Sequence, residues 1–275
     1  MSPKVSIIIP CYNHGHYLPE VLSNLDPLSP DYEVIIVNDG STHHETLEAL
    51  EIYRAKKYRI IDQANQGLSA ARNTGILNAG GSLILMLDAD NTIEKSYIEQ
   101  AVKSFEADQE IAVVYSDAEY FGNKSGRWDV GPFNLQRLLI ANYIDACAMI
   151  RKSVLDEVGG YDTEMKGGWE DWEMWLRIAI AGKKFHYIPE IGFKYRVYPN
   201  QMSGIIRNNY ENRNRLTAYL HKKYPAYLGH QHITEFVLIR FKPHPIHFII
   251  KLSMIAWFNK QYQKLLSKNK IIDGI

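Results

Sequence analysis

The sequence predicts an α/β protein built on a doubly wound, mostly parallel sheet. Up to about residue 117, short and nearly continuous apolar runs alternate with helical patterns. Strands of this kind are buried on both faces, so helices are expected to cover both sides of the sheet. At 275 residues with 46% hydrophobic content, the chain is also long enough to bury a large shared core.

Each apolar run is expected to be a strand, and each segment between two runs is expected to contain a helix. The strands are VSIIIP (5–10), YEVIIVND (32–39), YRIID (58–62), SLILMLD (82–88) and IAVVYSD (111–117). The helices lie near 17–25, 42–56, 68–79 and 95–107. Ligands of such sheets bind beyond the carboxyl ends of the strands. The residues that follow each strand are therefore the first candidates for a functional site.

Beyond residue 117 the alternation weakens, which indicates a second region built on the edge of the first. Its expected elements are a helix near 134–142, a strand at 146–151, a short helix at 153–158, the turn GGYD, a helix from about Asp171 to Gly182 and a strand at 185–190. We therefore expect three parts, namely residues 1–117, residues 118–205 and a helical, basic tail over residues 206–275.

Charge and cysteine content argue against several classes of protein. Lys plus Arg equals Asp plus Glu at 31 each, so no overall basic excess favours binding to nucleic acid. Cys11 and Cys147 lie far apart and outside any CxxC pattern, which argues against a disulfide framework or a zinc knuckle. The first apolar run is too short for a signal peptide and is broken by Pro10. We expect a cytoplasmic protein.

Acidic residues end the second and fourth expected strands. The segment NDGS (38–41) fits a plain turn as well as a ligand site. Asp88 and Asp90 follow the apolar run SLILML, and two carboxylates so close are costly unless a cation or hydrogen-bond donors compensate them. Hard divalent cations prefer carboxylate oxygens and often complete their shell with substrate phosphates. The pair therefore predicts a metal site.

No phosphate-binding glycine loop follows the first strand. Neither GxxxxGK[ST] nor GxGxxG occurs there, because the strand continues into PCYNHGHYL. This argues against P-loop NTPases, Rossmann dehydrogenases and sugar nucleotidyltransferases. A diphosphate bound without such a loop needs a metal bridge, which Asp88 and Asp90 could supply.

The stretch GGWEDWEMWLR (167–177) places two acids between tryptophans, after two glycines. Apolar residues recur at i, i+3, i+4 and i+7 from Trp172, which predicts a helix anchored by an apolar stripe. Glu170 and Asp171 then lie in its first turn, where carboxylates are favoured beside unpaired N–H groups. Helix capping and a role as catalytic base are compatible, and the residues alone leave both open.

The chain resembles family 2 glycosyltransferases over about residues 4–205. The segments that carry the resemblance are, in order, VSIIIPCYN, VNDGS, NQGLSAARNTG, LMLDADN, GGYD, WEDWEMWLR and YRVYPNQMS. The resemblance implies a GT-A fold with a Rossmann-like sheet. It also implies transfer of a sugar from a nucleotide diphosphate to an acceptor hydroxyl with inversion.

For the donor side, the resemblance implies a role for five residues. Pro10 and Tyr12 would line the nucleobase site. Asp39 would accept a hydrogen bond from the base, with Arg72 close by. Asp88 would approach the ribose and the metal shell. Residues 1–117 would then form the half that binds the nucleotide sugar.

For the metal and the acceptor, the resemblance implies further roles. Asp90 would be the direct ligand of Mn²⁺ or Mg²⁺ on the diphosphate, with Asp88 beside it. Asp171 would be the catalytic base, paired with Glu170. Glu170 and Trp169 would shape the sugar and acceptor sites. Residues 118–205 would thus be the acceptor-binding and catalytic half.

One position departs from the family pattern. Related enzymes often carry a metal-binding His in the segment that matches YRVYPNQMS, where this chain has Tyr198. A phenol is protonated at neutral pH and is a poor ligand for Mn²⁺ or Mg²⁺, so metal binding without nucleotide is expected to be weak. We predict a UDP-linked donor and transfer of a hexosyl or N-acetylhexosaminyl group. The alternative, favoured by Tyr198 alone, is a non-catalytic module that binds a nucleotide sugar or a glycan.

Several weaker signals remain. His14 and His16 are spaced like a metal pair but are expected to be ordinary loop residues. Trp128 and Phe133 fit either a sugar-stacking loop or the core, and the sequence does not decide between them.

The tail is the last uncertain segment. Residues 233–270 combine apolar runs with a basic excess, but the longest apolar run is broken by Lys251 and is too short to span a membrane. A basic helix on an anionic membrane surface and a helix packed on the catalytic domain both fit this pattern. The first would suit a glycan or lipid-linked acceptor and a peripheral location at the inner face of the membrane.

Overall fold

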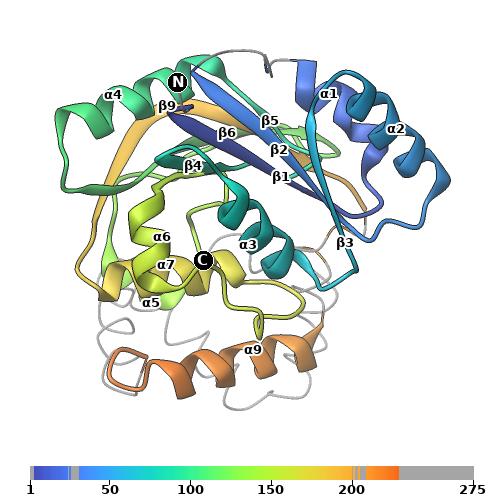
Figure 1. The fold of residues 1–275 in the computed structure, drawn as a ribbon. Coiled ribbons are helices and arrows are strands. Elements are labelled where there is room, and N and C mark those ends of the chain that lie inside the picture. The colour runs from blue at the N-terminus through green and yellow to red at the C-terminus, as the bar shows by residue number, and fades with distance from the viewer. Residues whose placement is uncertain are drawn as a thin grey trace. The chain divides into compact units, whose positions relative to one another are not determined.

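The computed structural model describes residues 3–23, 25, 31–199, 201, 204 and 209–228. The chain divides into two compact units, Met1–Ser203 and Gly204–Ile275. The first unit contains one mixed sheet with helices on both faces (Figure 1). This arrangement confirms the predicted doubly wound α/β class.

The described strands form a single sheet of the order β3-β2-β1-β4-β8-β6-β9-β5, with β7 paired to β6. In chain order they are β1 (Val5–Cys11), β2 (Tyr32–Asp39), β3 (Arg59–Gln63), β4 (Leu83–Met86), β5 (Thr92–Ile93), β6 (Ile111–Gly122), β7 (Gly126–Trp128), β8 (Met149–Arg151) and β9 (Lys184–Val197).

The four strands β1 to β4 form the parallel half of the sheet. Strand β1 lies at its centre, with β2 on one side and β4 on the other, and β3 extends it beyond β2. All residues of β1 and β4 are buried, as expected for strands covered on both faces. Because the strands are parallel, the residues after β1, β2 and β4 gather at one edge of the sheet.

The second half of the sheet departs from the predicted regular alternation. Strand β8 lies between β4 and β6 and runs antiparallel to both. Strand β9 is parallel to β6 and extends past the predicted segment 185–190, through a register shift after Ser116. Strand β4 ends at Met86, two residues before the predicted end, so that Asp88 lies in a turn. Strand order of this kind depends on long-range pairing, which periodicity does not report.

Helices α1, α2 and α4 cover one face of the sheet, and α3 covers the other together with α6 and α7 (Figure 1). The described helical elements of this unit are η1 (Gly15–Tyr17), α1 (Leu18–Ser23), α2 (His44–Ala55), α3 (Leu68–Asn78), α4 (Lys95–Ala107), α5 (Leu135–Ile140), α6 (Lys152–Val158) and α7 (Glu170–Ile180). Side chains alternate along β1, so that Ile7 and Ile9 belong to the core under α1, α2 and α4, whereas Ile8 meets α3.

Helix α3 packs unusually close to β1. A Cβ atom at Gly75 would lie 2.3 Å from Cγ2 of Ile8, so a larger residue could not occupy this position without a shift of the helix. The close approach matters for the site because Arg72 lies one turn earlier on the same helix.

The second unit contains the described helix α9 (Tyr210–Lys223), which begins after Asn209. The Asn209 side chain accepts a hydrogen bond from the N–H of Asn212 at 3.0 Å and so caps the helix. The tail segment 233–270, for which a membrane surface was considered, lies outside the described residues. None of the described helices is long and apolar enough to cross a membrane.

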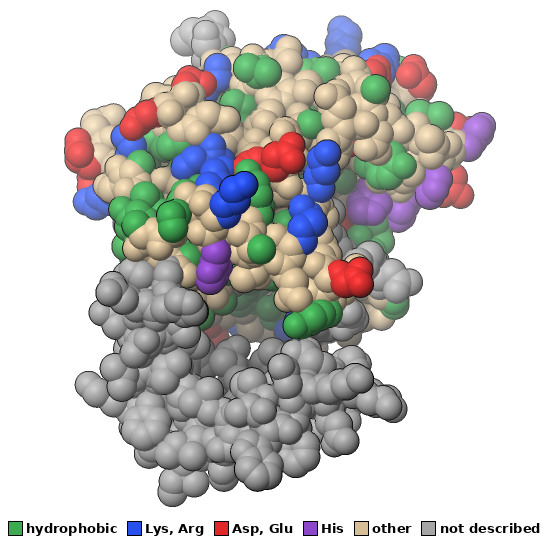
Figure 2. All heavy atoms as spheres, turned by 90° about the horizontal axis from the view of Figure 1, so that it is seen from below, with side chains coloured by type: hydrophobic (Ala, Val, Ile, Leu, Met, Phe, Trp, Pro, Cys, Tyr) green, Lys and Arg blue, Asp and Glu red, His purple; other side chains and the backbone are tan. Residues whose placement is uncertain are grey.

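Charged side chains of both signs are interspersed over the face shown in Figure 2, in keeping with the equal numbers of basic and acidic residues.

Candidate active site

Asp39, at the end of β2, organises the loop that leads into α3. Its carboxylate accepts hydrogen bonds from the N–H groups of Gln66 and Gly67, each at 2.9 Å, and from the side-chain amide of Gln63 at 2.7 Å. The side chain is buried. The hydrogen bonds described for Asp39 thus all come from residues 63–67, and the expected contact with a nucleobase stays a prediction.

The loops after β1 and β2 are tied together by Asn13. The side-chain oxygen of Asn13 accepts hydrogen bonds from the N–H groups of Thr42 and His43 at 2.8 and 3.0 Å, and the main-chain N–H of Asn13 donates to the Ser41 hydroxyl oxygen. Pro10 is a buried β1 residue, whereas the neighbouring Tyr12 is 46% exposed. Of the two expected nucleobase contacts, Tyr12 is therefore the accessible one.

The segment NDGS forms a turn, which was one of its two interpretations, the other being a ligand site. The side-chain oxygen of Asn38 accepts the N–H of Ser41 at 3.0 Å, which closes the turn over Asp39 and Gly40. The turn does not exclude a ligand, because Asp39 lies within it at the edge of the sheet where strand ends gather.

Asp88 and Asp90 lie in the turn after β4, at the same edge. Asp88 remains partly exposed. Burial and the negative charge of Asp88 raise the pKa of Asp90 to about 6, although the Tyr198 hydroxyl donates a hydrogen bond to the Asp90 carboxylate and opposes this shift. Arg196 fixes the turn by donating from Nε to the main-chain oxygen of Asp90 at 2.9 Å.

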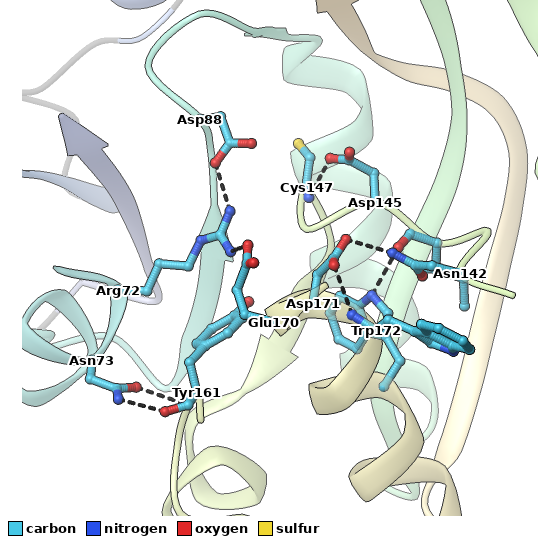
Figure 3. A network of polar contacts seen from close by, with 12 residues as sticks. Arg72, Asn73, Asp88, Asn142, Asp145, Cys147, Tyr161, Glu170, Asp171 and Trp172 are labelled. Atoms are coloured by element: carbon cyan, nitrogen blue, oxygen red, sulfur yellow. Dashed lines mark hydrogen bonds and ion pairs between the residues drawn. The ribbon is translucent and has the colours of Figure 1, made fainter. Parts of the chain in front are cut away.

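Arg72 joins this turn to α7 (Figure 3). Its Nη2 donates to Asp88 at 2.8 Å and its Nη1 donates to Glu170 at 2.6 Å. The guanidinium is 1% exposed and lies 5.1 Å from the ring centre of Tyr161. Arg72 therefore neutralises two carboxylates from distant parts of the chain. Its predicted place beside the nucleobase is not tested by these contacts and stays a prediction.

The chain enters α7 through a strained turn. Gly167 and Gly168 both have positive φ, at 88° and 124°, and Trp169 follows with φ at 61°. Glycine takes such angles freely, but Trp169 does so at a cost. The turn directs Glu170 towards Arg72 and places Asp171 on the adjoining side of the helix start (Figure 3).

Asp171, the predicted base, follows Glu170 in the first turn of α7. Burial and the neighbouring charge of Glu170 raise its pKa to about 7. One carboxylate oxygen accepts the N–H of Trp172 at 2.8 Å, and the other accepts the side-chain amide of Asn142 at 2.7 Å. The N–H of Trp172 belongs to the first turn of α7, so Asp171 contacts an N–H group of the helix start, and its role as catalytic base stays a prediction.

Two tryptophans of α7 hold the segment that carries Asn142. The indole N–H of Trp172 donates to the oxygen of Leu138 at 2.6 Å, and that of Trp175 donates to the oxygen of Ile144 at 2.9 Å. Both side chains are buried, which confirms the predicted apolar stripe. The hydrogen bonds add that the stripe fixes a loop directly beside Asp171.

Asn73 joins two segments that the sequence singled out separately. Its side-chain amide donates to the main-chain oxygen of Tyr161 at 2.8 Å and its side-chain oxygen accepts the Tyr161 N–H at 2.7 Å. A Cβ at Gly160 would lie 2.6 Å from that oxygen, so the GGYD turn needs glycine here. Asn73 and Asn142 were both missed by sequence reasoning, because neither residue type nor spacing marks a hydrogen bond to a distant segment.

The remaining candidates take different places. Trp169 is half-buried and meets Trp172 edge-on, with ring centres 5.3 Å apart, so its predicted contact with sugar or acceptor stays open. Trp128 stacks on Tyr120, and Phe133 stacks on Phe185 at 4.3 Å. Both rings are therefore engaged in packing within the protein.

The first of the two loop histidines, His14, lies among aromatic rings. His14 packs against Tyr17 and Tyr198, with ring centres 5.6 and 6.3 Å away. Over the described part of the chain, no three His, Cys, Asp or Glu side chains converge to hold a metal ion.

Comparison with known proteins identifies the family. Residues 6–159 match the model of glycosyl transferase family 2, and residues 83–259 match that of glycosyl transferase family group 2. The uncharacterized glycosyltransferase YwdF of Bacillus subtilis is 32% identical over 193 residues, which cover 64% of this chain and 68% of that protein. An uncharacterized glycosyltransferase of Rickettsia felis is 26% identical over 95% of this chain, which spans only 44% of that protein.

Solved structures show the same fold at lower identity. S. aureus TarS 1-349 in complex with UDP-GlcNAc superposes with a TM-score of 0.64 at 19% identity, covering 79% of this chain and 66% of that one. The mannosyltransferase PcManGT of Pyrobaculum calidifontis, in complex with GDP-Man and Mn²⁺, superposes with a TM-score of 0.57 at 18% identity. The match covers 97% of this chain and 84% of that one. The predicted GT-A type of sheet is confirmed, and the chain belongs to glycosyl transferase family 2.

Proposed function

We propose that the chain is an inverting glycosyltransferase, which moves a hexosyl or N-acetylhexosaminyl group from a UDP-linked donor to a hydroxyl of a glycan or lipid-linked acceptor. The observation that carries the proposal is the bridge from Asp88 through Arg72 to Glu170. The bridge brings the end of β4, where a diphosphate would bind, to the start of α7, where Asp171 could act as base.

In this mechanism Asp171 takes the proton of the acceptor hydroxyl. The acceptor oxygen attacks the anomeric carbon from the face opposite the diphosphate, and the bond from that carbon to the leaving phosphate oxygen breaks through an oxocarbenium-like transition state. A pKa of about 7 suits this task, because Asp171 is then partly ionised at neutral pH and can still hold a proton. Asn142 and the N–H of Trp172 would keep the carboxylate in place.

The acids of the β4 turn fit a divalent ion that arrives with the nucleotide. Asp90 offers hard oxygen ligands, but burial and the charge of Asp88 disfavour its ionised form. A cation would stabilise the ionised form against both effects. Only these two acids would serve, and diphosphate and water would complete the shell. Bound there, Mn²⁺ or Mg²⁺ would neutralise charge on the leaving diphosphate. Arg72, although buried, would keep Asp88 oriented towards the donor.

The donor class is supported by two solved structures of the same fold. TarS is in complex with UDP-GlcNAc and PcManGT with GDP-Man and Mn²⁺, so both hold a nucleotide-diphosphate sugar. These proteins are less than a quarter identical to the chain, and the choice of uridine over guanosine therefore rests on experiment.

Calorimetric titration tests the donor side. UDP, GDP, dTDP and CMP are added to the wild type and to Asp90→Ala, each with and without Mn²⁺. The proposal expects one diphosphate to bind in a Mn²⁺-dependent manner, with at least a tenfold loss in Asp90→Ala. If no nucleotide binds the wild type under any condition, the proposal is wrong.

Turnover tests the catalytic side against the second candidate function. The hydroxyl of Tyr198 already donates to Asp90, which favours a non-catalytic module that binds a nucleotide sugar or a glycan. A catalytic site releases nucleoside diphosphate from the selected donor, and Asp171→Asn abolishes that release while nucleotide binding persists. Equal, negligible release by the wild type and Asp171→Asn in the presence of a broad acceptor panel would favour the module.

A further inference from the structure

Asp145 is a carboxylate of the site that lies outside every recognised motif. It belongs to the segment between α5 and β8, and it interacts electrostatically with Asp88, Asp171 and Arg72. Figure 3 shows Asp145 above Asp171, with its carboxylate directed towards the N–H of Cys147. One of its oxygens accepts the N–H of Cys147 at 2.9 Å, which fixes the direction of the side chain.

The segment around Asp145 is held firmly. The main-chain oxygen of Ile144 accepts the indole N–H of Trp175 at 2.9 Å, and Asn142 donates to Asp171. Hydrogen bonds to α7 at Asn142 and Ile144 therefore tie the segment that carries Asp145 to the helix that carries Asp171. A carboxylate fixed in this way contributes a defined acceptor direction to whatever binds beside Asp171.

Among the described residues, the hydrogen bond given for Asp145 is the one from the N–H of Cys147, and it does not offset the cost of burying the charge. Burial, together with the charge of Asp88, raises the pKa of Asp145 well above its usual range. Part of Asp145 nevertheless stays accessible to solvent, so a ligand in the site can reach it. Hydroxyl groups of a ligand are neutral donors that would compensate the carboxylate without adding charge.

A buried hydroxyl group near these acids, that of Tyr161, has no hydrogen-bond partner among the described residues. The Tyr161 hydroxyl is buried among Arg72, Glu170 and Asp171 and makes no hydrogen bond to any described residue. Buried hydroxyls are nearly always paired in proteins, with protein or with an ordered molecule. The hydroxyl of Tyr161 therefore points independently to a polar occupant, a ligand or its ordered water, beside the network.

We infer that Asp145 contacts the transferred sugar, where it accepts hydrogen bonds from the sugar hydroxyls and favours uncharged over carboxylated sugars. The inference rests on the proposed function, which puts the diphosphate near Asp88 and the attacked carbon near Asp171. Asp145 interacts with both, so the sugar ring between them is the part of the donor within its reach. A uronic acid would bring one more carboxyl group to the acids Asp88, Asp145, Glu170 and Asp171, of which Asp88 and Glu170 are hydrogen-bonded to Arg72.

The test compares a nucleotide with and without its sugar. UDP, UDP-glucose, UDP-N-acetylglucosamine and UDP-glucuronic acid are titrated calorimetrically into the wild type, Asp145→Ala and Asp145→Asn with Mn²⁺. Asp156→Ala, which removes an exposed aspartate of α6, is the matched control. If the wild type selects GDP, then GDP, GDP-mannose and GDP-mannuronic acid take their places. Circular dichroism and melting temperature establish that each variant is folded.

The expected result is specific to the sugar. In Asp145→Ala, UDP affinity stays within twofold of the wild type, while affinity for the better uncharged UDP-sugar falls about tenfold or more. Asp145→Asn keeps one acceptor oxygen, so its affinity for the UDP-sugar lies between those of the wild type and Asp145→Ala. The wild type binds UDP-glucuronic acid more weakly than UDP-glucose, and this gap narrows in Asp145→Ala.

Other outcomes overturn the inference. If UDP and UDP-sugar affinities fall together, Asp145 supports the structure of the segment and does not touch the sugar. If neither affinity changes, the residue has no part in binding. If the wild type itself binds no nucleotide, the proposed function fails first, and that result is distinct from a change confined to the Asp145 variants.

Discussion

Arg72 and Glu170 form a hydrogen-bonded ion pair at 2.6 Å, although 98 residues separate them in the sequence. Both side chains are buried, and the second terminal nitrogen of Arg72 is occupied by Asp88. The pair therefore holds α3, the β4 turn and α7 together. Glu170 raises the pKa of Asp171 and Arg72 lowers it, so the same pair acts on the stability of the fold and on the proposed base.

Replacement of Arg72 by Met, a side chain of similar length without charge, should destabilise the protein strongly. Glu170 and Asp88 would be left without their cation, and removal of one member of a buried ion pair typically costs about 3–5 kcal/mol. Urea unfolding followed by circular dichroism measures the free energy of unfolding. A loss below about 1 kcal/mol would show that water readily replaces the guanidinium.

A double variant separates loss of the ion pair from loss of packing. In Arg72→Met/Glu170→Gln the buried charge of residue 170 is removed as well, so part of the lost stability should return. Glu170→Gln alone keeps Arg72 paired with Asp88 and is expected to be the milder single change. Strictly additive effects would contradict direct coupling between the two side chains.

Asp171 should make the folded protein less stable as pH rises. Its pKa is about 7 in the folded chain and near 3.8 without the fold, so between these values the folded state holds a proton that the unfolded state has lost. Its contribution is therefore most favourable below about pH 4 and is lost as pH rises through 7. Asp171→Asn removes this dependence, and its stability relative to the wild type should increase over that range by a few kcal/mol at most.

Urea unfolding of both proteins at intervals from pH 4 to 8 tests this expectation. The difference between wild type and variant is the informative quantity, because titrating groups distant from Asp171 contribute equally to both. A difference that stays constant with pH would mean that Asp171 titrates near its ordinary value.

Asn142 should set the pH at which the base becomes active. Its amide donates to the Asp171 carboxylate at 2.7 Å and lowers the pKa of that group, because the bond favours the ionised form. In Asn142→Ala the acidic limb of the kcat/KM profile should move upwards by about one pH unit from a midpoint near 7. A fall in rate at every pH without movement of the limb would indicate that Asn142 only supports the loop.

The parallel half of the fold was predictable because its signal is local. Strands β1 to β4 are short apolar runs separated by helical patterns, and each lies within two residues of its expected bounds. The insertion of β8 between β4 and β6 was not predictable, because it depends on pairing between residues more than sixty positions apart. Strand β5 has two residues and gives no periodic signal at all.

The site residues likewise fall into those that the sequence predicts and those that it does not. Asp88, Asp90 and Asp171 were predicted because short motifs carry them. Their partners were not, since hydrogen bonds from Arg72 to Glu170 or from Asn142 to Asp171 join residues that are distant in sequence. A motif identifies which side chains carry chemistry, whereas only the folded chain shows which side chains orient them.

Tyr198 gives the sharpest prediction for the metal. Its hydroxyl donates to Asp90, and burial together with the charge of Asp90 raises the pKa of Tyr198, so the phenol is expected to be a poor metal ligand at neutral pH. Tyr198→His would offer a neutral nitrogen at the same place, and Mn²⁺ binding in the presence of UDP should tighten about tenfold.

Tyr198→Phe is the control, since it removes the hydroxyl without providing a ligand. Electron paramagnetic resonance of free Mn²⁺ measures the affinity directly and does not depend on turnover. If His and Phe bind Mn²⁺ equally well, position 198 does not reach the ion, and Asp90 with the diphosphate alone determines its affinity. If only His binds more tightly, the phenol of the natural chain limits metal affinity, and tight Mn²⁺ binding then depends on the nucleotide.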